Sequence, residues 1–213
     1  MNAIFFRKER YGVQVLERSH PSRLHSEAAG LGVGPNVHTF VETYIKRSDD
    51  YAIKLTEMEI WGEKAELLAK MPAPYTMRMT NWKTIYDILK DFLLDDDPNL
   101  PAAMYKTDVD VAAVREEDGG VSVRYRDVDT GGEGVLRADL VIAADGANSS
   151  IRTQIWQPES PGYAGYVLWR GRVPETVVSE ETRKALQDKI VFQRLKGGYM
   201  LSYVLPRPWL VLR

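Results

Sequence analysis

Apolar positions recur along this chain with two periods, and the period predicts the kind of element. Residues 82–93 repeat apolar side chains every three or four positions, which predicts an amphipathic helix that Thr80 can cap. The segment 4–11 is apolar and then basic, and Gly12 closes it, as expected for the last turns of a helix. A further short helix is predicted over 148–156.

Short runs of β-branched and aromatic residues predict strands. Val13–Leu16 follows the first helix and ends in polar residues, which predicts a buried strand and half of a βαβ unit. Loose alternation over 53–79 predicts two or three strands of a partly exposed antiparallel layer. Glycine pairs at 119 and 131 then predict a meander that returns to the main sheet. The later strands are expected at 109–114, 121–125, 135–143, 163–173, near 191 and at 199–205.

A segment rich in small residues, 24–36, separates the first strand from the next helix. Its glycines and alanines predict a flexible loop, and Pro35 suits the first turn of a helix that runs to about Arg47. Gly30, Gly32 and Gly34 imitate a phosphate-binding fingerprint. No strand precedes them, so we interpret them as part of the loop.

Composition narrows the class of protein. The chain has 213 residues, 44% hydrophobic and 27% charged, which indicates a globular protein with one substantial core, or with one domain and part of a second. The formal net charge of −2 gives no basic patch for nucleic acid. The absence of cysteine excludes disulfides and thiolate sites, and the three histidines lack metal-ligand spacing, so no metal site is predicted. No apolar run is long enough to span a membrane, and a cytoplasmic protein is expected.

The clearest chemical signal lies in ADLVIAADGANSSIR, residues 138–152. An apolar run at 140–144 predicts a strand that ends at Asp145, followed by a polar helix start. Such a helix presents backbone N–H groups to an anion such as a pyrophosphate, and an aspartate there can accept a ribose hydroxyl. The alternative is an ordinary strand–turn–helix connection in which Asp-Gly only forms the turn.

This string closely resembles the DG motif of the FAD-dependent aromatic hydroxylases, the group A flavoprotein monooxygenases. VQVLERS, residues 13–19, resembles the family's second strand, whose acidic residue, here Glu17, binds the adenosine ribose of FAD. A solvated surface charge is the alternative for Glu17 alone. Weaker matches follow in family order, most similar to the dihydroxypyridine hydroxylase-like branch. They cover 24–36, 80–93 and 163–175.

The resemblance implies an α/β fold with two interleaved parts. An incomplete Rossmann-type FAD-binding domain would take 1–50 and 80–160, and a partial mixed β-sheet substrate-binding domain would take 51–79 and 161–213. FAD is then the cofactor, NAD(P)H the co-substrate, and the reaction a hydroxylation of a small aromatic or N-heteroaromatic molecule. No catalytic side chain is assigned. The implied cofactor-binding residues are Glu17, Arg18, Asp145, Gly146, Asn148 and Ser149.

The sequence also departs from the family. The first strand with its GxGxxG phosphate turn is missing, and so is the later GD motif, so we expect a chain truncated at both ends. Two alternatives follow. The chain can be a non-catalytic or degenerate fragment that does not bind FAD, or another FAD-dependent oxidoreductase on the same framework. A small aromatic substrate is the expected partner, neither nucleic acid nor a membrane is expected, and a homodimer is left open.

Overall fold

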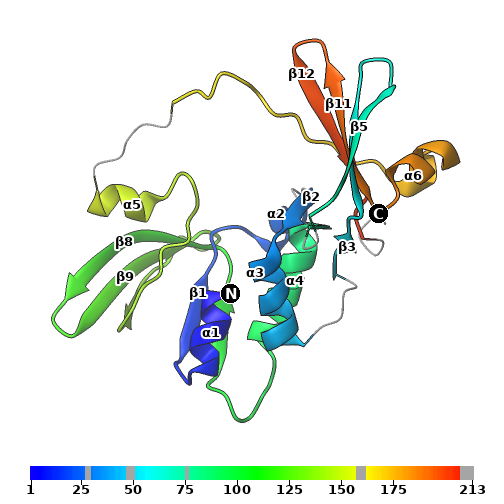
Figure 1. The fold of residues 1–213 in the computed structure, drawn as a ribbon. Coiled ribbons are helices and arrows are strands. Elements are labelled where there is room, and N and C mark those ends of the chain that lie inside the picture. Colours follow the sequence, from blue (N-terminus) through cyan, green and yellow to red (C-terminus); the bar gives the residue numbers. More distant parts are fainter. Residues whose placement is uncertain (27–29, 47–50, 75–76, 157–161, 207–213) are drawn as a thin grey trace. The chain divides into compact units, whose positions relative to one another are not determined.

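The computed structural model describes residues 1–26, 30–46, 51–74, 77–156 and 162–206 (Figure 1). The chain forms two compact units. The first unit consists essentially of residues 27–93 and 170–213, and the second unit of residues 2–26 and 94–169. Both units combine helices with small sheets, which confirms the mixed α/β class. No helix among the described residues has the length and apolar character needed to cross a bilayer.

The second unit begins with a helix and a strand, as predicted. Helix α1 (Asn2–Lys8) packs on strand β1 (Val13–Leu16), which pairs in parallel with β7 (Ala103–Lys106). Strand β1 is only half-buried, whereas the sequence predicted full burial. The reason is that β7 is its one partner among the described strands, so neighbours do not enclose it. A short helix, α2 (Pro21–Ser26), follows β1.

A three-stranded antiparallel meander completes the second unit. Its strands follow the order β10-β9-β8, with a shift in the β8–β9 register at Ala112, and helix α5 contacts β8. Gly119 and Gly131 occupy the two turns with φ of 84° and 70°, the left-handed region that glycine adopts without strain. The bounds are β8 (Val109–Glu117), β9 (Gly120–Asp127), β10 (Glu133–Ala138) and α5 (Ser150–Ile155).

The predicted continuation of the third meander strand to residue 143 is wrong. Strand β10 ends at Ala138, and residues 140–146 belong to no strand. Leu140 and Ile142 are 60% and 49% exposed. No described strand pairs with this segment, so its backbone has no ladder to join, and the apolar run alone does not make a strand.

In the first unit, a small sheet with two helices surrounds a buried core. Strand β6 (Arg78–Asn81) lies between β2 (Gly30–Val33) and β3 (Ile53–Lys54), antiparallel to both. A helical segment, α3 (Pro35–Phe40) continued by the π-helix η1 (Val41–Ile45), confirms the predicted helix from Pro35. The core residues are Val33, Val41, Tyr51, Ala52 and Ile88.

Strand β2 corrects the predicted flexible loop at 24–36. Gly30 lies so close to Tyr203 that an added Cβ would stand 2.4 Å from the tyrosine hydroxyl oxygen, so the absence of a side chain permits the packing. Gly30 therefore serves strand packing. Residues 27–29 of the predicted loop lie outside the described residues.

The predicted amphipathic helix is α4 (Trp82–Leu93), but its cap is one residue later than expected. The Asn81 side-chain oxygen accepts the backbone N–H of Thr84 at 2.9 Å. Thr80 instead donates its hydroxyl to the Tyr51 carbonyl at 2.5 Å. Because strand β6 runs directly into the helix, the polar residue at the junction takes the cap and Thr80 stays in the strand.

A four-stranded sheet, in the order β12-β11-β4-β5, forms the rest of the first unit. Strands β4 and β11 are parallel, and the two outer pairs are antiparallel. The predicted strand near 191 is confirmed, and so is the strand predicted over 199–205 except that it ends at Tyr203. The bounds are β4 (Glu57–Trp61), β5 (Leu67–Pro72), β11 (Lys189–Leu195) and β12 (Gly198–Tyr203), with the 3-10 turn η3 (Glu175–Val177) and helix α6 (Glu180–Leu186) before β11.

The predicted strand over 163–173 is wrong. These residues run without pairing to any described strand, and Trp169 is 90% exposed. Their β-branched and aromatic side chains favour a strand, but β-propensity reflects packing against neighbours, which this segment lacks.

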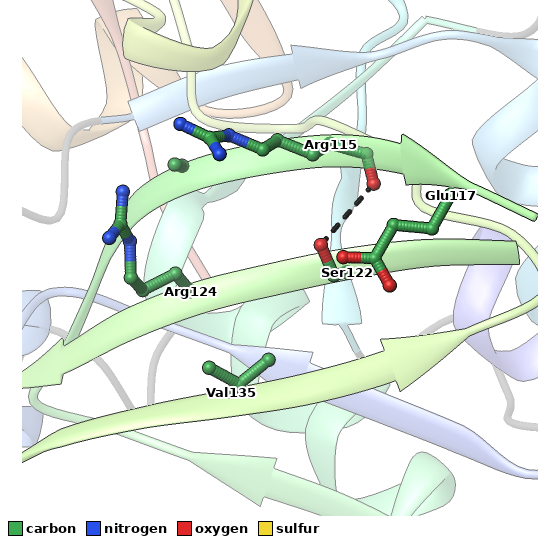
Figure 2. A pocket seen from close by; sticks show the side chains of 6 residues that line it. Arg115, Glu117, Ser122, Arg124 and Val135 are labelled. Atoms are coloured by element: carbon green, nitrogen blue, oxygen red, sulfur yellow. Dashed lines mark hydrogen bonds between the residues drawn. The ribbon is translucent and has the colours of Figure 1, made fainter.

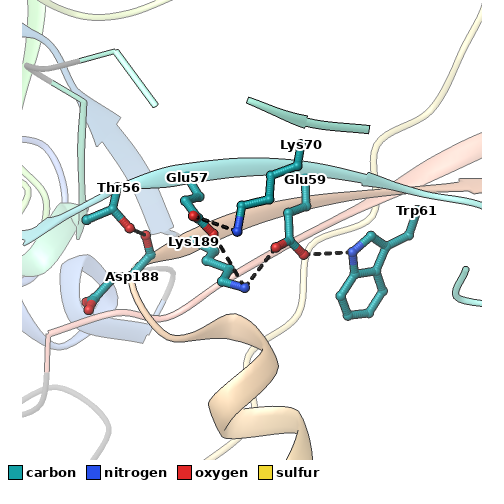
Figure 3. A network of polar contacts seen from close by, with 7 residues as sticks. All are labelled: Thr56, Glu57, Glu59, Trp61, Lys70, Asp188 and Lys189. Carbon is teal, nitrogen blue, oxygen red and sulfur yellow. Dashed lines mark hydrogen bonds and ion pairs between the residues drawn. The ribbon is translucent and has the colours of Figure 1, made fainter. Parts of the chain in front are cut away.

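One face of the four-stranded sheet carries a polar network (Figure 3). The buried carboxylate of Glu59 accepts hydrogen bonds from Lys189 Nζ and from Trp61 Nε1, each at 2.8 Å. The hydrogen bond from Lys189 lowers the pKa of Glu59 against the opposing effect of burial, and the same bond raises the pKa of Lys189. Glu57 bonds to Lys70 at 2.7 Å, which lowers the pKa of Glu57. Lys189 is therefore the cation that keeps the buried Glu59 charged.

Candidate functional site

All six predicted cofactor-binding residues lie in the second unit, in two segments attached to strand β8. The carbonyl of Glu17 accepts the N–H of Val109, at the start of that strand, at 3.0 Å. Further along β8, the Gln154 side chain of α5 bonds to the backbone of Ala112 and Val114 at 3.2 and 3.3 Å. The strand therefore supports both segments. Within the described residues, no hydrogen bond or ion pair joins the side chains of the two segments.

Glu17 stands immediately after β1, half-buried. Its backbone N–H donates to the Lys106 carbonyl at 2.8 Å, which extends the pairing with β7 by one residue. The Oε1 atom of its carboxylate accepts the N–H of Ser19 at 2.7 Å. No donor to Oε2 is found in the part of the chain that the structure describes. Glu17 thus offers one unused carboxylate oxygen at a strand end, and the neighbouring Arg18 is exposed.

Asp145 and Ser149 build the start of helix α5. Oδ1 of Asp145 accepts the hydroxyl of Ser149 at 2.5 Å, and Oδ2 accepts the N–H of Ile151 at 3.2 Å. Burial alone would raise the pKa of Asp145, but these hydrogen bonds outweigh it and the pKa is lowered. The Ser149 hydroxyl in turn accepts the N–H of Arg152 at 2.9 Å.

The helix start therefore differs from the sequence prediction in one respect. The N–H groups of Ile151 and Arg152, expected to be free for an anion, are occupied by the chain's own oxygens. Residues outside the predicted set, Ser19 and Ile151, complete the contacts of the two acidic side chains. The sequence could have indicated both residues, because a carboxylate in a turn or before a helix often accepts a backbone N–H that follows it closely. Here the N–H groups lie two and six residues after the carboxylates.

Gly146 gives the segment an open side. Its φ of +82° is the left-handed conformation, and no atom lies within 4 Å of an added Cβ. Backbone conformation rather than crowding therefore requires glycine here. The guanidinium of Arg152 donates to the Ala147 carbonyl at 2.5 Å, which holds the turn, while Asn148 is exposed. A ligand can approach the backbone at Gly146.

Replacing Asp145 with alanine is expected to lower the free energy of unfolding by about 1 kcal/mol, because the Ser149 hydroxyl and the Ile151 N–H lose their acceptor at the helix start. The lowered pKa means that ionised Asp145 stabilises the fold above its ordinary pKa, near 4, and that this contribution is lost as the pH falls. Denaturant unfolding at pH 7 and pH 3 measures both effects. Asp139→Ala, an exposed carboxylate in the same unit, is the control, and an equal loss in the control would contradict the role of Asp145.

The known proteins to which this chain is similar include an FAD-binding family and several monooxygenases. Residues 163–208 match the FAD binding domain-like family. The 2,6-dihydroxypyridine 3-monooxygenase of Paenarthrobacter nicotinovorans is 28% identical over 96% of this chain and 48% of its own length. The 6-hydroxynicotinate 3-monooxygenase of Bordetella bronchiseptica is 28% identical over 68% of this chain and 38% of its own length. The resemblance to flavin-dependent aromatic hydroxylases is therefore confirmed in sequence.

The fold comparison agrees. A crystal structure of a 2-methyl-3-hydroxypyridine-5-carboxylic acid oxygenase mutant superposes with a TM-score of 0.63 at 19% identity, covering 96% of this chain and 51% of that chain. At this identity the likeness concerns the fold alone. The chain spans about half the length of the first curated relative it matches, and less of the second.

Proposed function

We propose that this chain, a relative of the FAD-dependent aromatic hydroxylases, supplies FAD-binding residues to an NAD(P)H-dependent monooxygenase. The substrate would be a small aromatic or N-heteroaromatic molecule, as the names of both curated relatives suggest. The observation that carries the proposal is that one strand, β8, supports both the half-buried Glu17 and the Asp145 turn, within a chain related to these enzymes over 96% of its length.

The geometry of Glu17 fits an adenosine ribose. A ribose offers two vicinal hydroxyl donors, and a carboxylate at a strand's carboxyl end accepts such donors in dinucleotide-binding folds. Ser19 fixes the orientation of the carboxylate through Oε1, and Oε2 is left to accept a hydroxyl. Exposed Arg18 stands beside it and would neighbour the adenosine phosphate.

The 145–149 segment would position the flavin rather than react with it. Asp145 and Ser149 use their side-chain oxygens to fix the turn, so the surface they offer is the backbone around Gly146, with Asn148 beside it. FAD, when bound, supplies the redox chemistry of oxygen transfer. These residues bind and orient the cofactor, and no side chain of this set needs to exchange a proton with substrate.

The predicted domain ranges, 1–50 with 80–160 and 51–79 with 161–213, accompany this function as a proposal. The boundaries of the compact units differ from these ranges, because residues 27–50 and 80–93 belong to the same unit as the four-stranded sheet. The predicted domains are defined by which residues would contact the cofactor or the substrate. The compact units are defined by which parts of the backbone lie close together. The Rossmann-type arrangement is proposed on the same basis.

One observation favours a second candidate, a related chain that does not hold FAD. Leu140, Ile142 and Trp169 expose large apolar surfaces. Such surface is normally covered in a folded protein or by a partner. If the chain does not bind FAD, its similarity to the hydroxylases would reflect common ancestry and not a shared activity.

The test is to titrate FAD into the purified 213-residue chain while following flavin fluorescence and the melting temperature. We expect saturable quenching, and stabilisation by about 2.7 kcal/mol at a FAD concentration one hundred times the Kd. Riboflavin is the matched control, because it has the flavin but lacks the adenosine ribose assigned to Glu17, and it should bind more weakly. Purified chain that neither retains nor responds to FAD would favour the second candidate.

A further inference from the structure

The meander of the second unit has a hollow on one face that the proposed FAD contacts do not use (Figure 2). It measures about 160 Å³ and is lined by Ala113, Arg115, Glu117, Ser122, Arg124 and Val135, from all three strands. One water molecule needs only about 10–15 Å³ of such space, so the hollow has room for several waters or one small polyatomic ion. None of the lining residues belongs to the predicted cofactor set.

Two arginines in this hollow have no carboxylate directly opposite them on a neighbouring strand. Arg124 stands opposite Ala113 and Val135, and Arg115 opposite Ser122. By contrast, Arg126 stands between Asp110 and Glu133 on the neighbouring strands. Directly opposed residues are the closest cross-strand neighbours, so they decide whether a charge is neutralised locally.

The remaining charges in the hollow do not neutralise these two arginines. Glu117 is paired with Arg137 at 3.2 Å. Within the described part of the chain, no ion pair to Arg115 or Arg124 is found, and Ser122 uses its hydroxyl only in a long, 3.5 Å bond to the Arg115 carbonyl. Figure 2 shows both arginine side chains extending to the same end of the hollow, away from Glu117.

We propose that this hollow binds a small oxyanion with phosphoryl chemistry, held between Arg115 and Arg124. The two residues are diagonal cross-strand neighbours, about 7–8 Å apart at the backbone, which long side chains can bridge. Two like charges at this spacing repel, and an anion between them removes that repulsion. Guanidinium groups present several N–H donors in a planar fork that matches phosphate oxygens, and the Ser122 hydroxyl adds a further polar group.

The experiment is to titrate inorganic phosphate into the ¹⁵N-labelled full chain and follow the arginine Nε–H signals by NMR. We expect saturable shifts at Arg115 and Arg124, and none with sodium chloride at the same ionic strength. Arg124→Gln should raise the apparent Kd at least about fivefold, whereas Arg126→Gln, which removes the same charge from the same strand and face, should change it less than about twofold.

The outcomes separate the alternatives. Shifts that stay linear with phosphate, or an equal loss of affinity in Arg126→Gln, would mean general charge screening and would overturn the site. Glycerol 3-phosphate is the second probe: tighter binding than inorganic phosphate assigns the site to a phosphate ester, and the reverse assigns it to the free ion. The titration of the wild-type chain shows by itself whether phosphate binding saturates, so the proposal can be tested even if a variant fails to fold. FAD binding through Glu17 is measured separately and can succeed or fail on its own.

Discussion

Replacing Lys189 by methionine is expected to lower the free energy of unfolding by about 2–3 kcal/mol. Glu59 is only 5% exposed, and the substitution leaves its carboxylate buried with Trp61 as its one remaining described donor. Removing one partner of a buried ion pair costs about 3–5 kcal/mol, and the partial exposure of Lys189 reduces this figure. Denaturant unfolding at pH 7 measures the loss.

The matched control is Lys70→Met on the neighbouring strand. Its ion pair with Glu57 is more exposed and is screened by solvent, so the expected loss is clearly smaller than that of Lys189→Met. The substitution at Lys189 also changes the acid response. In the parent chain, Glu59 has a lowered pKa, so its ionised form stabilises the fold above pH 4–5 and this contribution fades as the pH falls. Without Lys189, acid unfolding should begin at a higher pH. Equal losses in both variants would show that Glu59 does not depend on Lys189.

Replacing Glu17 by alanine is expected to raise the Kd for FAD by roughly ten- to a hundredfold. A charge-assisted hydrogen bond to a ribose hydroxyl is worth about 1.5–3 kcal/mol, and alanine removes the acceptor entirely. Fluorescence titration of FAD measures the change. Glu17→Gln keeps an acceptor for the Ser19 N–H but removes the charge, so it should retain stability and show an intermediate Kd.

The control for Glu17 is Glu9→Ala, which removes the same charge from the exposed surface of the same unit. Its Kd for FAD should stay within about twofold of the parent value, because exposed charges at a distance are screened by salt. Unchanged affinity in Glu17→Ala, with FAD still binding, would show that another residue contacts the ribose and would remove Glu17 from the proposed site.

The sequence predicted those elements whose signal is local. Periodicity located the helix over 82–93, and the strand at 13–16 was placed to the residue. The two wrong strands, ending at 143 and covering 163–173, have suitable side chains but no described partner strand, and pairing is a property of the rest of the chain. The same limit explains Gly30, whose role depends on Tyr203, far away in sequence.

For the candidate site, the sequence offers residues but not their contacts. The motif strings identified Glu17 and Asp145 as residues of interest, and the structure shows one carboxylate with an unused oxygen and one that is used by its own helix. The sequence alone could not separate these two situations, because they depend on which N–H groups lie within reach. Arg115 and Arg124 escaped notice because only the strand register reveals that their neighbours are uncharged.

The parallel pairing of β4 with β11 has a consequence for synthesis on the ribosome. The two strands are joined by the bond between Glu59 and Lys189, 130 residues apart in sequence. At about 5–20 residues per second, the β4–β5 hairpin, which ends at Pro72, waits roughly 6–23 seconds before strand β11 begins to emerge at Lys189. Throughout that interval one edge of β4 is open to other nascent chains, and Glu59 has no lysine from β11. We therefore expect chaperone dependence during translation to concentrate on this hairpin.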